Sequence, residues 1–198
     1  GIFMIYVVSD LHGEYDKFIK MLDLIQFSNN DKMYILGDVI DRGKDSIKLL
    51  QFVINHQSNI EMLLGNHEEM MLETICNKYS SYISCWMNNG GESTYEQFKL
   101  LSMYDQHIII DYLKQLPLYK IVDNYILVHS GIDTSYIPEK PISAKQYMDL
   151  QFKENLLWSR EEFINYPAIS NYKIIFGHTP TLYMYRWNNK NIHDITIW

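Results

Sequence analysis

The sequence has few cysteines, no long hydrophobic run and no basic leader segment. Two cysteines in 198 residues are too few for the disulfide framework of small secreted domains, and they point to a reducing compartment. No apolar stretch reaches the roughly 18 residues that a membrane-spanning helix needs. The first residues contain no basic segment of the kind that begins a signal peptide. We therefore expect a cytoplasmic protein without a membrane partner.

Basic residues are also scarce. The 17 Lys and Arg residues against 24 Asp and Glu residues give a net charge of −7. Non-specific nucleic-acid binding relies on a basic surface, so we expect no nucleic-acid partner. An acidic protein is also poorly suited to a phosphate-bearing substrate, unless its carboxylates bind cations and so reverse the local field. The charge balance therefore leaves metal-dependent phosphate chemistry open.

The length and the 47% hydrophobic content predict a single domain over residues 1–198. Short apolar runs alternate with stretches of helical periodicity, which indicates an α/β fold. The strands expected in the first half are Met4–Val8, Met33–Leu36 and Ile60–Leu64. Helices are expected from about Tyr15, over Ile47–Ile54 and through Met70 to Ile75, and looser helical sequence continues to Leu116. In the second half we expect a hairpin of Tyr119–Val122 and Tyr125–Val128, followed by strands at Lys173–Phe176, Leu182–Trp187 and from Ile192.

Five of the expected strands end in clusters of polar residues and glycine. The clusters are Ser9–Gly13, Gly37-Asp38, Gly65–Glu68, His129–Gly131 and Gly177–Thr179. Only nine glycines occur in the chain, yet every cluster contains one, as expected where backbone must approach a ligand closely. Because ligands of layered α/β folds bind beyond the carboxyl ends of the strands, we expect the five clusters to converge.

The side chains of these clusters suit a site for two divalent metal ions. Asp10 and His12 are two residues apart, so both can reach one cation, and Asp38 has two carboxylate oxygens that can bridge two cations. The donors left for a second ion are Asn66, His129 and His178. Mixed oxygen and nitrogen ligands favour Mn, Fe or Zn over Ca. Two divalent ions outweigh the two carboxylates, which leaves a positive site that can bind phosphate and acidify a water.

The same clusters carry a family resemblance. Asp10–Gly13 is similar to the D-x-H-G motif of the metallophosphoesterases, Gly37–Gly43 to G-D-x-x-D-R-G, and Gly65–Glu68 to G-N-H-E. The two remaining clusters follow in the family's order. Further segments, Trp86–Gly91 and Leu157–Phe163, resemble bacterial members of the phosphoprotein-phosphatase branch. The ordered set extends from about Met4 to Pro180 and is far more specific than any single motif.

The resemblance implies a calcineurin-like metallophosphoesterase fold, an α/β (α+β layered) arrangement with a β-sandwich flanked by helices. It implies two divalent ions, with Mn favoured and Fe or Zn as alternatives. One ion would be bound by Asp10, His12 and Asp38, and the other by Asp38, Asn66, His129 and His178. The nucleophile would be a hydroxide that bridges the two ions.

The resemblance also implies four catalytic residues. His67 would be the general acid that protonates the leaving alcohol, and Asp41 would orient it. Arg42 and Arg160 would contact the phosphate oxygens in the bidentate geometry that only a guanidinium provides.

Taken singly, the motifs have simpler explanations. Asp10 followed by His12 is commonly a helix cap, and Asp41-Arg42 is commonly a surface ion pair worth under about 1 kcal/mol. A purely structural explanation must account for every cluster independently. A metal-binding scaffold without turnover is a further alternative, but a scaffold has no use for the acid pair His67 and Asp41 or for two phosphate-binding arginines.

The activity implied first is that of the bacterial and phage serine/threonine protein phosphatases, which hydrolyse phosphoserine and phosphothreonine, and phosphotyrosine as an option. The substrate would then be a phosphoprotein or a small phosphate ester, and the oligomeric state stays open. The runner-up is a nucleotide hydrolase that resembles the symmetrical diadenosine tetraphosphatases, because these share the motifs. Leu64 keeps this alternative open, since many relatives have an arginine immediately before Gly65.

Overall fold

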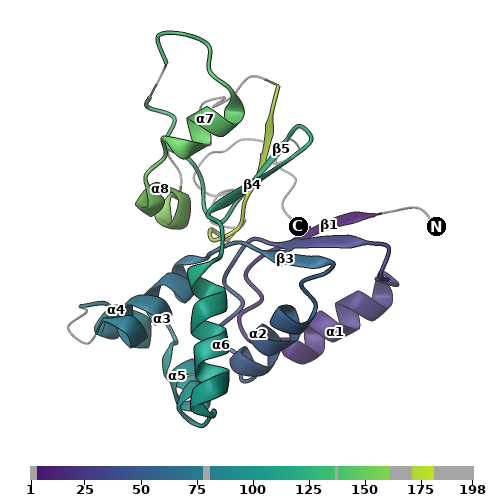
Figure 1. Ribbon diagram of the computed structural model, residues 1–198, viewed down its shortest axis with the longest axis vertical. Coiled ribbons are helices and arrows are strands. Elements are labelled where there is room, and N and C mark those ends of the chain that lie inside the picture. The colour runs from purple at the N-terminus through teal and green to yellow at the C-terminus, as the bar shows by residue number, and fades with distance from the viewer. Residues whose placement is uncertain (1–3, 78–80, 137, 161–170, 181–198) are drawn as a thin grey trace. The chain divides into compact units, whose positions relative to one another are not determined.

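The computed structural model describes residues 4–77, 81–136, 138–160 and 171–180 (Figure 1). The chain divides into two compact units, Gly1–Leu116 and Pro117–Trp198. Each unit is described by itself, and the expected single domain over residues 1–198 stays a prediction.

The first unit is built on a three-stranded parallel sheet. Its strands are β1 (Ile5–Val8), β2 (Lys32–Ile35) and β3 (Ile60–Met62), in the order β1-β2-β3. The helices α1 (Tyr15–Leu24) and α2 (Ser46–Asn55) connect successive strands, as parallel pairing requires. Both helices lie beneath the strands in Figure 1. The register pairs Val8 with Ile35 and Ile35 with Met62, so the three strands end level with one another.

The core of this unit forms where the apolar pattern of the sequence predicts burial. The central strand β2 buries Met33, Tyr34 and Ile35, which matches its continuous apolar run. Helix α2 buries Leu49, Leu50 and Val53 at helical spacing. This packing fixes the carboxyl ends of the strands, from which the loops with the predicted ligands begin.

Four further helices lie in the described part of the first unit. They are α3 (Asn66–Cys76), α4 (Tyr82–Asn88), α5 (Glu92–Lys99) and α6 (Met103–Lys114). Helix α3 begins immediately after the short loop that follows β3, so its first turn carries the G-N-H-E motif. In the described part of the chain, no helix combines the length and the apolar character that a membrane span requires.

The described residues of the second unit form a mixed sheet and two short helices. Strands β4 (Tyr119–Val122) and β5 (Tyr125–Val128) form an antiparallel hairpin, and β6 (Lys173–Ile175) pairs in parallel with β5. The helices are α7 (Ala144–Asp149) and α8 (Lys153–Trp158). The core of this unit includes Val128, Met148, Leu156 and Phe176.

The expected fold class is confirmed, because both units combine helices with sheets. The hairpin has the predicted bounds, and Asp123 adopts the positive φ of 51° that its tight turn requires. Strands β1, β2, β3 and β6 fall within two residues of their predicted ranges. The strands expected at Leu182–Trp187 and from Ile192 lie outside the described residues.

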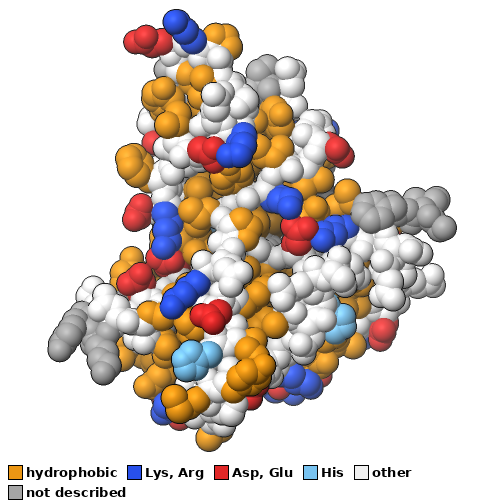
Figure 2. Space-filling model, viewed as in Figure 1, with side chains coloured by type: hydrophobic (Ala, Val, Ile, Leu, Met, Phe, Trp, Pro, Cys, Tyr) orange, Lys and Arg blue, Asp and Glu red, His pale blue; other side chains and the backbone are white. Residues whose placement is uncertain are grey.

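Acidic, basic and apolar side chains are interspersed on the surface drawn in Figure 2. Several of the charged side chains form exposed ion pairs, such as Lys17 with Glu14 at 3.1 Å and Lys99 with Glu96 at 2.7 Å. Pairs of this kind contribute under about 1 kcal/mol each. The buried apolar residues, rather than these pairs, therefore account for the stability of the fold.

Candidate metal centre and active site

The loops after β1 and β2 run side by side and are held together by backbone hydrogen bonds. The amide of Asp10 donates to the carbonyl of Gly37 at 3.2 Å, and the amide of His12 donates to the carbonyl of Asp38 at 2.9 Å. These bonds bring three predicted ligands, Asp10, His12 and Asp38, to the same edge of the parallel sheet, as expected from its topology.

The backbone of these loops is strained at the predicted site residues. Positive φ angles occur at Asp10 (56°), His12 (41°), Asp38 (56°), Asp41 (74°) and Arg42 (65°). Each such residue costs on the order of 1–3 kcal/mol, and strain of this kind gathers at functional sites. The sequence contains these residues in place of the glycines that the backbone would favour, which indicates that their side chains are needed.

Glu68 anchors the loop that carries Asp38. Its carboxylate is fully buried and accepts the backbone N–H groups of Asp38 at 2.9 Å, Val39 at 2.8 Å, Ile40 at 3.3 Å and Gly65 at 3.1 Å. A carboxylate bound by several N–H groups is stabilised in its charged form. No role was predicted for Glu68, although an acidic residue at the third position of a helix is a recognisable capping signal.

Gly65 allows the start of α3 to approach the Asp38 loop. A Cβ at this position would lie 2.3 Å from Asp38 Oδ1 and 2.4 Å from the Asp38 nitrogen, so no other residue fits. The next residue, Asn66, is buried at the first position of α3, and the amide of His67 donates to Asp38 Oδ1 at 3.1 Å. The G-N-H-E segment is therefore packed directly against the Asp38 carboxylate.

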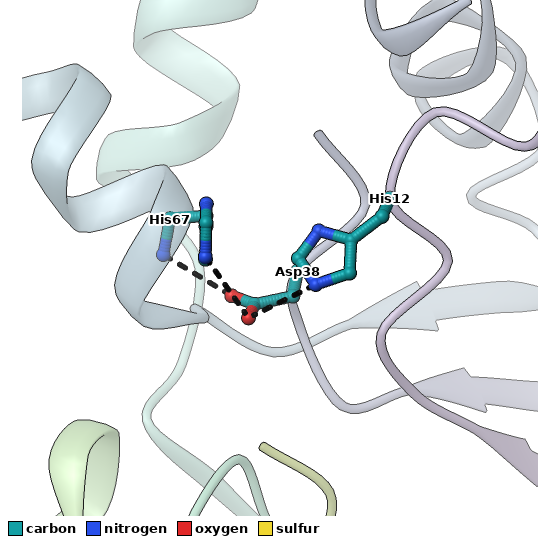
Figure 3. Close-up of side chains that lie close together, drawn as sticks. All are labelled: His12, Asp38 and His67. Carbon is teal, nitrogen blue, oxygen red and sulfur yellow. Dashed lines mark hydrogen bonds and ion pairs between the residues drawn. The ribbon is translucent and has the colours of Figure 1, made fainter. Parts of the chain in front are cut away.

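Three donor atoms form a group with the spacing of metal ligands (Figure 3). Asp38 Oδ2 lies 3.8 Å from His12 Nε2 and 3.9 Å from His67 Nε2, and all three donors lie within 4.8 Å of one another. Donors that share an ion at about 2.0–2.2 Å are separated by roughly 3–4 Å, so this group fits a divalent cation. His67 belongs to the group by position, whereas the role predicted for it is that of an acid.

The His12 ring is prepared for ligation by its own surroundings. Its Nδ1 lies 2.9 Å from the Ile40 carbonyl, so Nδ1 carries the proton and Nε2 presents its lone pair. Burial lowers the pKa of His12 below its usual 6.5 and outweighs the opposing charge of Asp38. A neutral imidazole whose Nε2 keeps its lone pair is the form that binds metals, and in this structure that lone pair accepts from Arg42 Nη1 at 2.9 Å.

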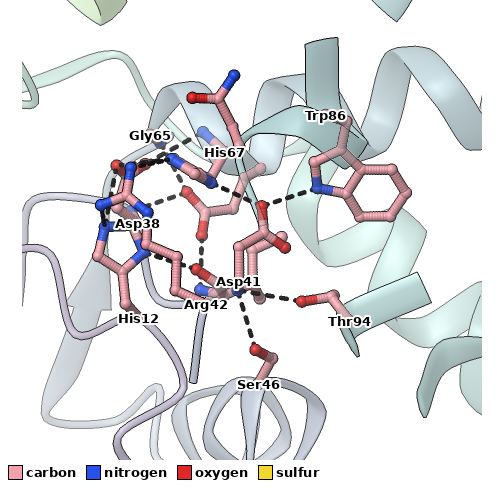
Figure 4. A network of polar contacts seen from close by, with 12 residues as sticks. His12, Asp38, Asp41, Arg42, Ser46, Gly65, His67, Trp86 and Thr94 are labelled. Atoms are coloured by element: carbon pink, nitrogen blue, oxygen red, sulfur yellow. Dashed lines mark hydrogen bonds and ion pairs between the residues drawn. The ribbon is translucent and has the colours of Figure 1, made fainter. Parts of the chain in front are cut away.

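His67 and Asp41 form a buried, hydrogen-bonded pair (Figure 4). The Nδ1 atom of His67 donates to Asp41 Oδ2 at 2.6 Å, and the exposed fractions of these side chains are 1% and 0%. Burial lowers the pKa of His67, but the hydrogen bond to Asp41 and the charges of Asp38, Asp41 and Glu68 outweigh it and raise the pKa above 6.5. The pair has the geometry that a general acid and its orienting carboxylate require.

The Asp41 backbone is fixed from two further elements. Its N–H donates to Ser46 Oγ at 2.9 Å, in the first turn of α2, and to Thr94 Oγ1 at 3.0 Å, on α5. The indole N–H of Trp86, on α4, donates to the Asp41 carboxylate at 2.7 Å. Three helices therefore hold one residue of the loop after β2.

Arg42 directs its guanidinium at both histidines. Its Nη1 lies 2.9 Å from His12 Nε2 and its Nη2 lies 3.2 Å from His67 Nε2. A guanidinium only donates, so both Nε2 atoms accept and both rings are neutral in this arrangement. This contact opposes the raised pKa of His67. Protonation of His67 at Nε2 requires Arg42 to move to another acceptor, and a phosphate oxygen is such an acceptor.

In the second unit, the remaining predicted histidines lie next to each other. His129 follows β5 and His178 follows β6, with ring centroids 5.1 Å apart, and the amide of Gly177 donates to the His129 carbonyl at 2.8 Å. His178 also contacts Trp158 edge-on at 6.0 Å and has a positive φ of 63°. Arg160 is exposed just after α8.

The structure thus places the predicted site residues in two groups. The group in the first unit consists of Asp10, His12, Asp38, Asp41, Arg42, Asn66 and His67. The group in the second unit pairs His129 with His178. The individual roles of these residues, and that of Arg160, stay predictions.

Comparison with known proteins identifies the family. The sequence model of the calcineurin-like phosphoesterases matches residues 3–196. The chain therefore belongs to the calcineurin-like phosphoesterase family, and the resemblance inferred from the motifs is confirmed. Family membership supports a hydrolase that uses divalent metals, and the donor groups described above are consistent with it.

Curated relatives share the name symmetrical bis(5'-nucleosyl)-tetraphosphatase. The protein from Wigglesworthia glossinidia brevipalpis is 31% identical over 172 residues, which cover 84% of this chain and 57% of the relative. The protein from Chromobacterium violaceum is 26% identical over 190 residues, which cover 93% of this chain and 58% of the relative. The chain thus spans little more than half the length of these relatives.

Two solved structures share the fold. A candidate diadenosine tetraphosphatase has a TM-score of 0.58 at 18% identity, with 90% of this chain and 80% of that one covered. A serine/threonine protein phosphatase from Saccharomyces cerevisiae has a TM-score of 0.53 at 18% identity, with 89% and 58% covered. At this identity the likeness concerns the fold and not the substrate.

The comparisons correct the activity expected first. The phosphoprotein phosphatase interpretation was wrong, because the curated relatives are named as nucleotide tetraphosphatases and not as protein phosphatases. The error has a physical origin, since the metal-binding and acid motifs serve phosphoester cleavage in general. A small phosphate ester agrees with these relatives, whereas a protein substrate has no support.

Proposed function

We propose that this protein hydrolyses dinucleoside tetraphosphates symmetrically, with two divalent metal ions. The observation that carries the proposal is the similarity to symmetrical bis(5'-nucleosyl)-tetraphosphatases over 84% of the chain. The reaction breaks the central phosphoanhydride bond. Water adds its oxygen to one phosphorus, and the leaving oxygen takes a proton, so that two nucleoside diphosphates are released.

The proposed ligands are those that the family resemblance implies. Asp10, His12 and Asp38 would hold one ion, and Mn is the first choice ahead of Fe or Zn. The second ion would be held by Asp38, Asn66, His129 and His178. When bound, such ions polarise a phosphoryl oxygen and acidify a coordinated water. The spacing of the donors around Asp38 Oδ2 and the neutral ring of His12 support this part of the proposal.

The remaining residues act on the phosphate chain and on the leaving group. The two terminal guanidinium nitrogens of Arg42 contact His12 and His67. We propose that they bind phosphate oxygens instead when the substrate is present. That movement releases His67 Nε2, which then holds the proton for the leaving phosphate oxygen. Asp41 accepts the other ring N–H and keeps the ring in position. Arg160 is proposed as a second phosphate contact.

Product analysis tests the substrate. With Mn²⁺ present, diadenosine tetraphosphate is expected to yield ADP as the only nucleotide product, because attack at the central bond gives two equal halves. The measurement is separation of the products by ion-exchange chromatography, with turnover of p-nitrophenyl phosphate recorded for comparison. Formation of ATP and AMP in equal amounts would contradict symmetrical cleavage. A higher kcat/KM on p-nitrophenyl phosphate than on the tetraphosphate would contradict the proposed substrate.

Substitution of Arg42 tests phosphate binding. Arg42→Lys keeps the positive charge but loses the bidentate geometry. We expect kcat/KM on diadenosine tetraphosphate to fall by about 10- to 100-fold, which corresponds to the roughly 1.5–3 kcal/mol of a charge-assisted hydrogen bond. Arg160→Lys is expected to act in the same direction. The matched control is Lys44→Gln, which removes a neighbouring exposed charge. An unchanged kcat/KM in Arg42→Lys would show that the guanidinium is structural.

A further inference from the structure

Trp86 donates to the same carboxylate oxygen as the catalytic histidine. The indole Nε1 lies 2.7 Å from Asp41 Oδ2, and His67 Nδ1 lies 2.6 Å from that atom. Figure 4 shows the indole and the imidazole on opposite sides of the Asp41 carboxylate. All three side chains are buried, and the exposed fraction of Trp86 is 0%. The proposed function assigns no role to Trp86, although it begins one of the segments that resemble the family.

The second oxygen of the Asp41 carboxylate accepts no such hydrogen bond from the described residues. Asp41 Oδ1 is buried, and it has no hydrogen-bond partner among the described residues. The torsion that rotates an aspartate carboxylate is broad and roughly two-fold, so packing alone defines its orientation poorly. Two N–H donors on one oxygen, from opposite sides, define it well. Without the indole N–H, only His67 would hold the Asp41 carboxylate. The carboxylate would then be as mobile as the imidazole that it orients.

Trp86 is itself held in place by the glycines that follow it. A Cβ on Gly91 would lie 2.5 Å from Trp86 Cδ1 and Nε1, so only glycine lets the indole occupy this position. The carbonyl of Gly90 accepts the backbone N–H of Arg42 at 3.1 Å. Tyr95 packs edge-on against the indole at 6.0 Å. The segment Trp86–Gly91 thus supports Asp41 through a side chain and Arg42 through the backbone.

We propose that Trp86 is a positioning residue for the leaving-group acid. Its indole N–H fixes the Asp41 carboxylate so that Oδ2 faces His67, and the imidazole then presents Nε2 to the leaving oxygen. Trp86 touches neither substrate nor metal, and it acts through Asp41. The inference rests on the proposed hydrolysis of phosphate esters with His67 as the acid. It does not depend on which phosphate ester is the natural substrate.

The test compares leaving groups in Trp86→Phe, which keeps an aromatic ring but lacks the N–H. The leaving group of phenyl phosphate is a phenol, which resembles a tyrosine side chain and has a pKa of about 10. On this ester we expect kcat to fall by about 10-fold, which is the effect of losing one charge-assisted hydrogen bond. On p-nitrophenyl phosphate, whose leaving group is much more acidic, kcat should change by less than about 2-fold, and KM should be unchanged on both esters. Equal losses on the two substrates would overturn the proposal.

A double-mutant cycle separates positioning from general damage. Once Asp41→Ala has removed the accepting oxygen, the indole has nothing left to orient. We therefore expect Trp86→Phe to lower kcat on phenyl phosphate far less in the Asp41→Ala background than in the wild type. Losses that simply multiply would mean that Trp86 acts independently of Asp41 and would overturn the proposal. Tyr95→Phe is the control, because it keeps the ring that packs on Trp86, and it should match the wild type.

A second variant covers the case in which Trp86→Phe folds poorly because its smaller ring leaves a cavity. Site-specific incorporation of benzothienylalanine at position 86 keeps the size of the indole and replaces the N–H by sulfur. This protein should show the same leaving-group dependence, and wild-type kcat on phenyl phosphate would overturn the role of the N–H. Failure of the proposed function is recognised separately. In that case the wild-type protein releases no ADP from diadenosine tetraphosphate, or His67→Asn shows no preference between the two aryl phosphates.

Discussion

Asp38→Asn is expected to lose most of its bound metal and to lower phosphatase activity by more than about 100-fold. Loss of a group that only orients a metal ligand already lowers metal affinity or activity by about 10- to 100-fold. Asp38 is proposed as a ligand shared by both ions, so its loss should have a larger effect. The substitution is conservative for the fold, because asparagine tolerates the positive φ of 56° at this position and still offers an oxygen to the His67 amide. The measurements are metal content by mass spectrometry and kcat/KM on p-nitrophenyl phosphate with Mn²⁺.

The control for this prediction is Asp16→Asn, which removes an equivalent charge from the exposed face of α1. It should retain full metal content and activity. Removal of metal from the wild-type protein by a chelator should abolish turnover, and addition of Mn²⁺ should restore it. Full activity of the metal-free protein would refute metal dependence, and two ions per chain in Asp38→Asn would show that Asp38 does not bridge them.

Local sequence patterns predicted the strands and helices because these depend on near neighbours in the chain. The hairpin around Asp123 requires a turn residue with positive φ between two apolar runs, and these features lie within ten residues. Asp10 and Asp38 are far apart in the sequence and were expected together for a different reason, because the ends of adjacent parallel strands meet at one edge of a sheet.

The supporting contacts were not predictable because they join residues that are far apart in the sequence. Glu68 binds the amide of Asp38 across 30 positions, and Trp86 binds Asp41 across 45 positions. No periodicity encodes such a pair, and only the packing of α3 and α4 against the loop shows it. The substrate class was predicted wrongly for another reason. The motifs specify groups that bind metal and move protons, and these groups are the same for an alkyl phosphate and for a phosphoanhydride.

The contacts of His67 allow two roles, acid and ligand. Its Nε2 lies 3.9 Å from Asp38 Oδ2, within the group that has ligand spacing, while its Nδ1 is bound to Asp41 at 2.6 Å. An acid and a ligand make opposite predictions for the metal content of His67→Asn. As an acid, His67 can be replaced without loss of metal, and only the step that protonates the leaving group suffers. As a ligand, its replacement releases metal, and all substrates lose activity alike.

We expect His67 to behave as an acid and not as a metal ligand. In His67→Asn, kcat on phenyl phosphate should fall by about 100- to 10,000-fold, which is the range of general acid catalysis. The loss on p-nitrophenyl phosphate should be at least ten times smaller, because nitrophenolate leaves with little need for a proton. Asp41→Asn should show the same preference more weakly, because the ring remains but loses the charge that orients it. His56→Asn, at an exposed histidine stacked on Phe52, should match the wild type on both substrates. Metal content measured on the same samples decides between the two roles: equal losses on the two esters together with a loss of metal would make His67 a ligand.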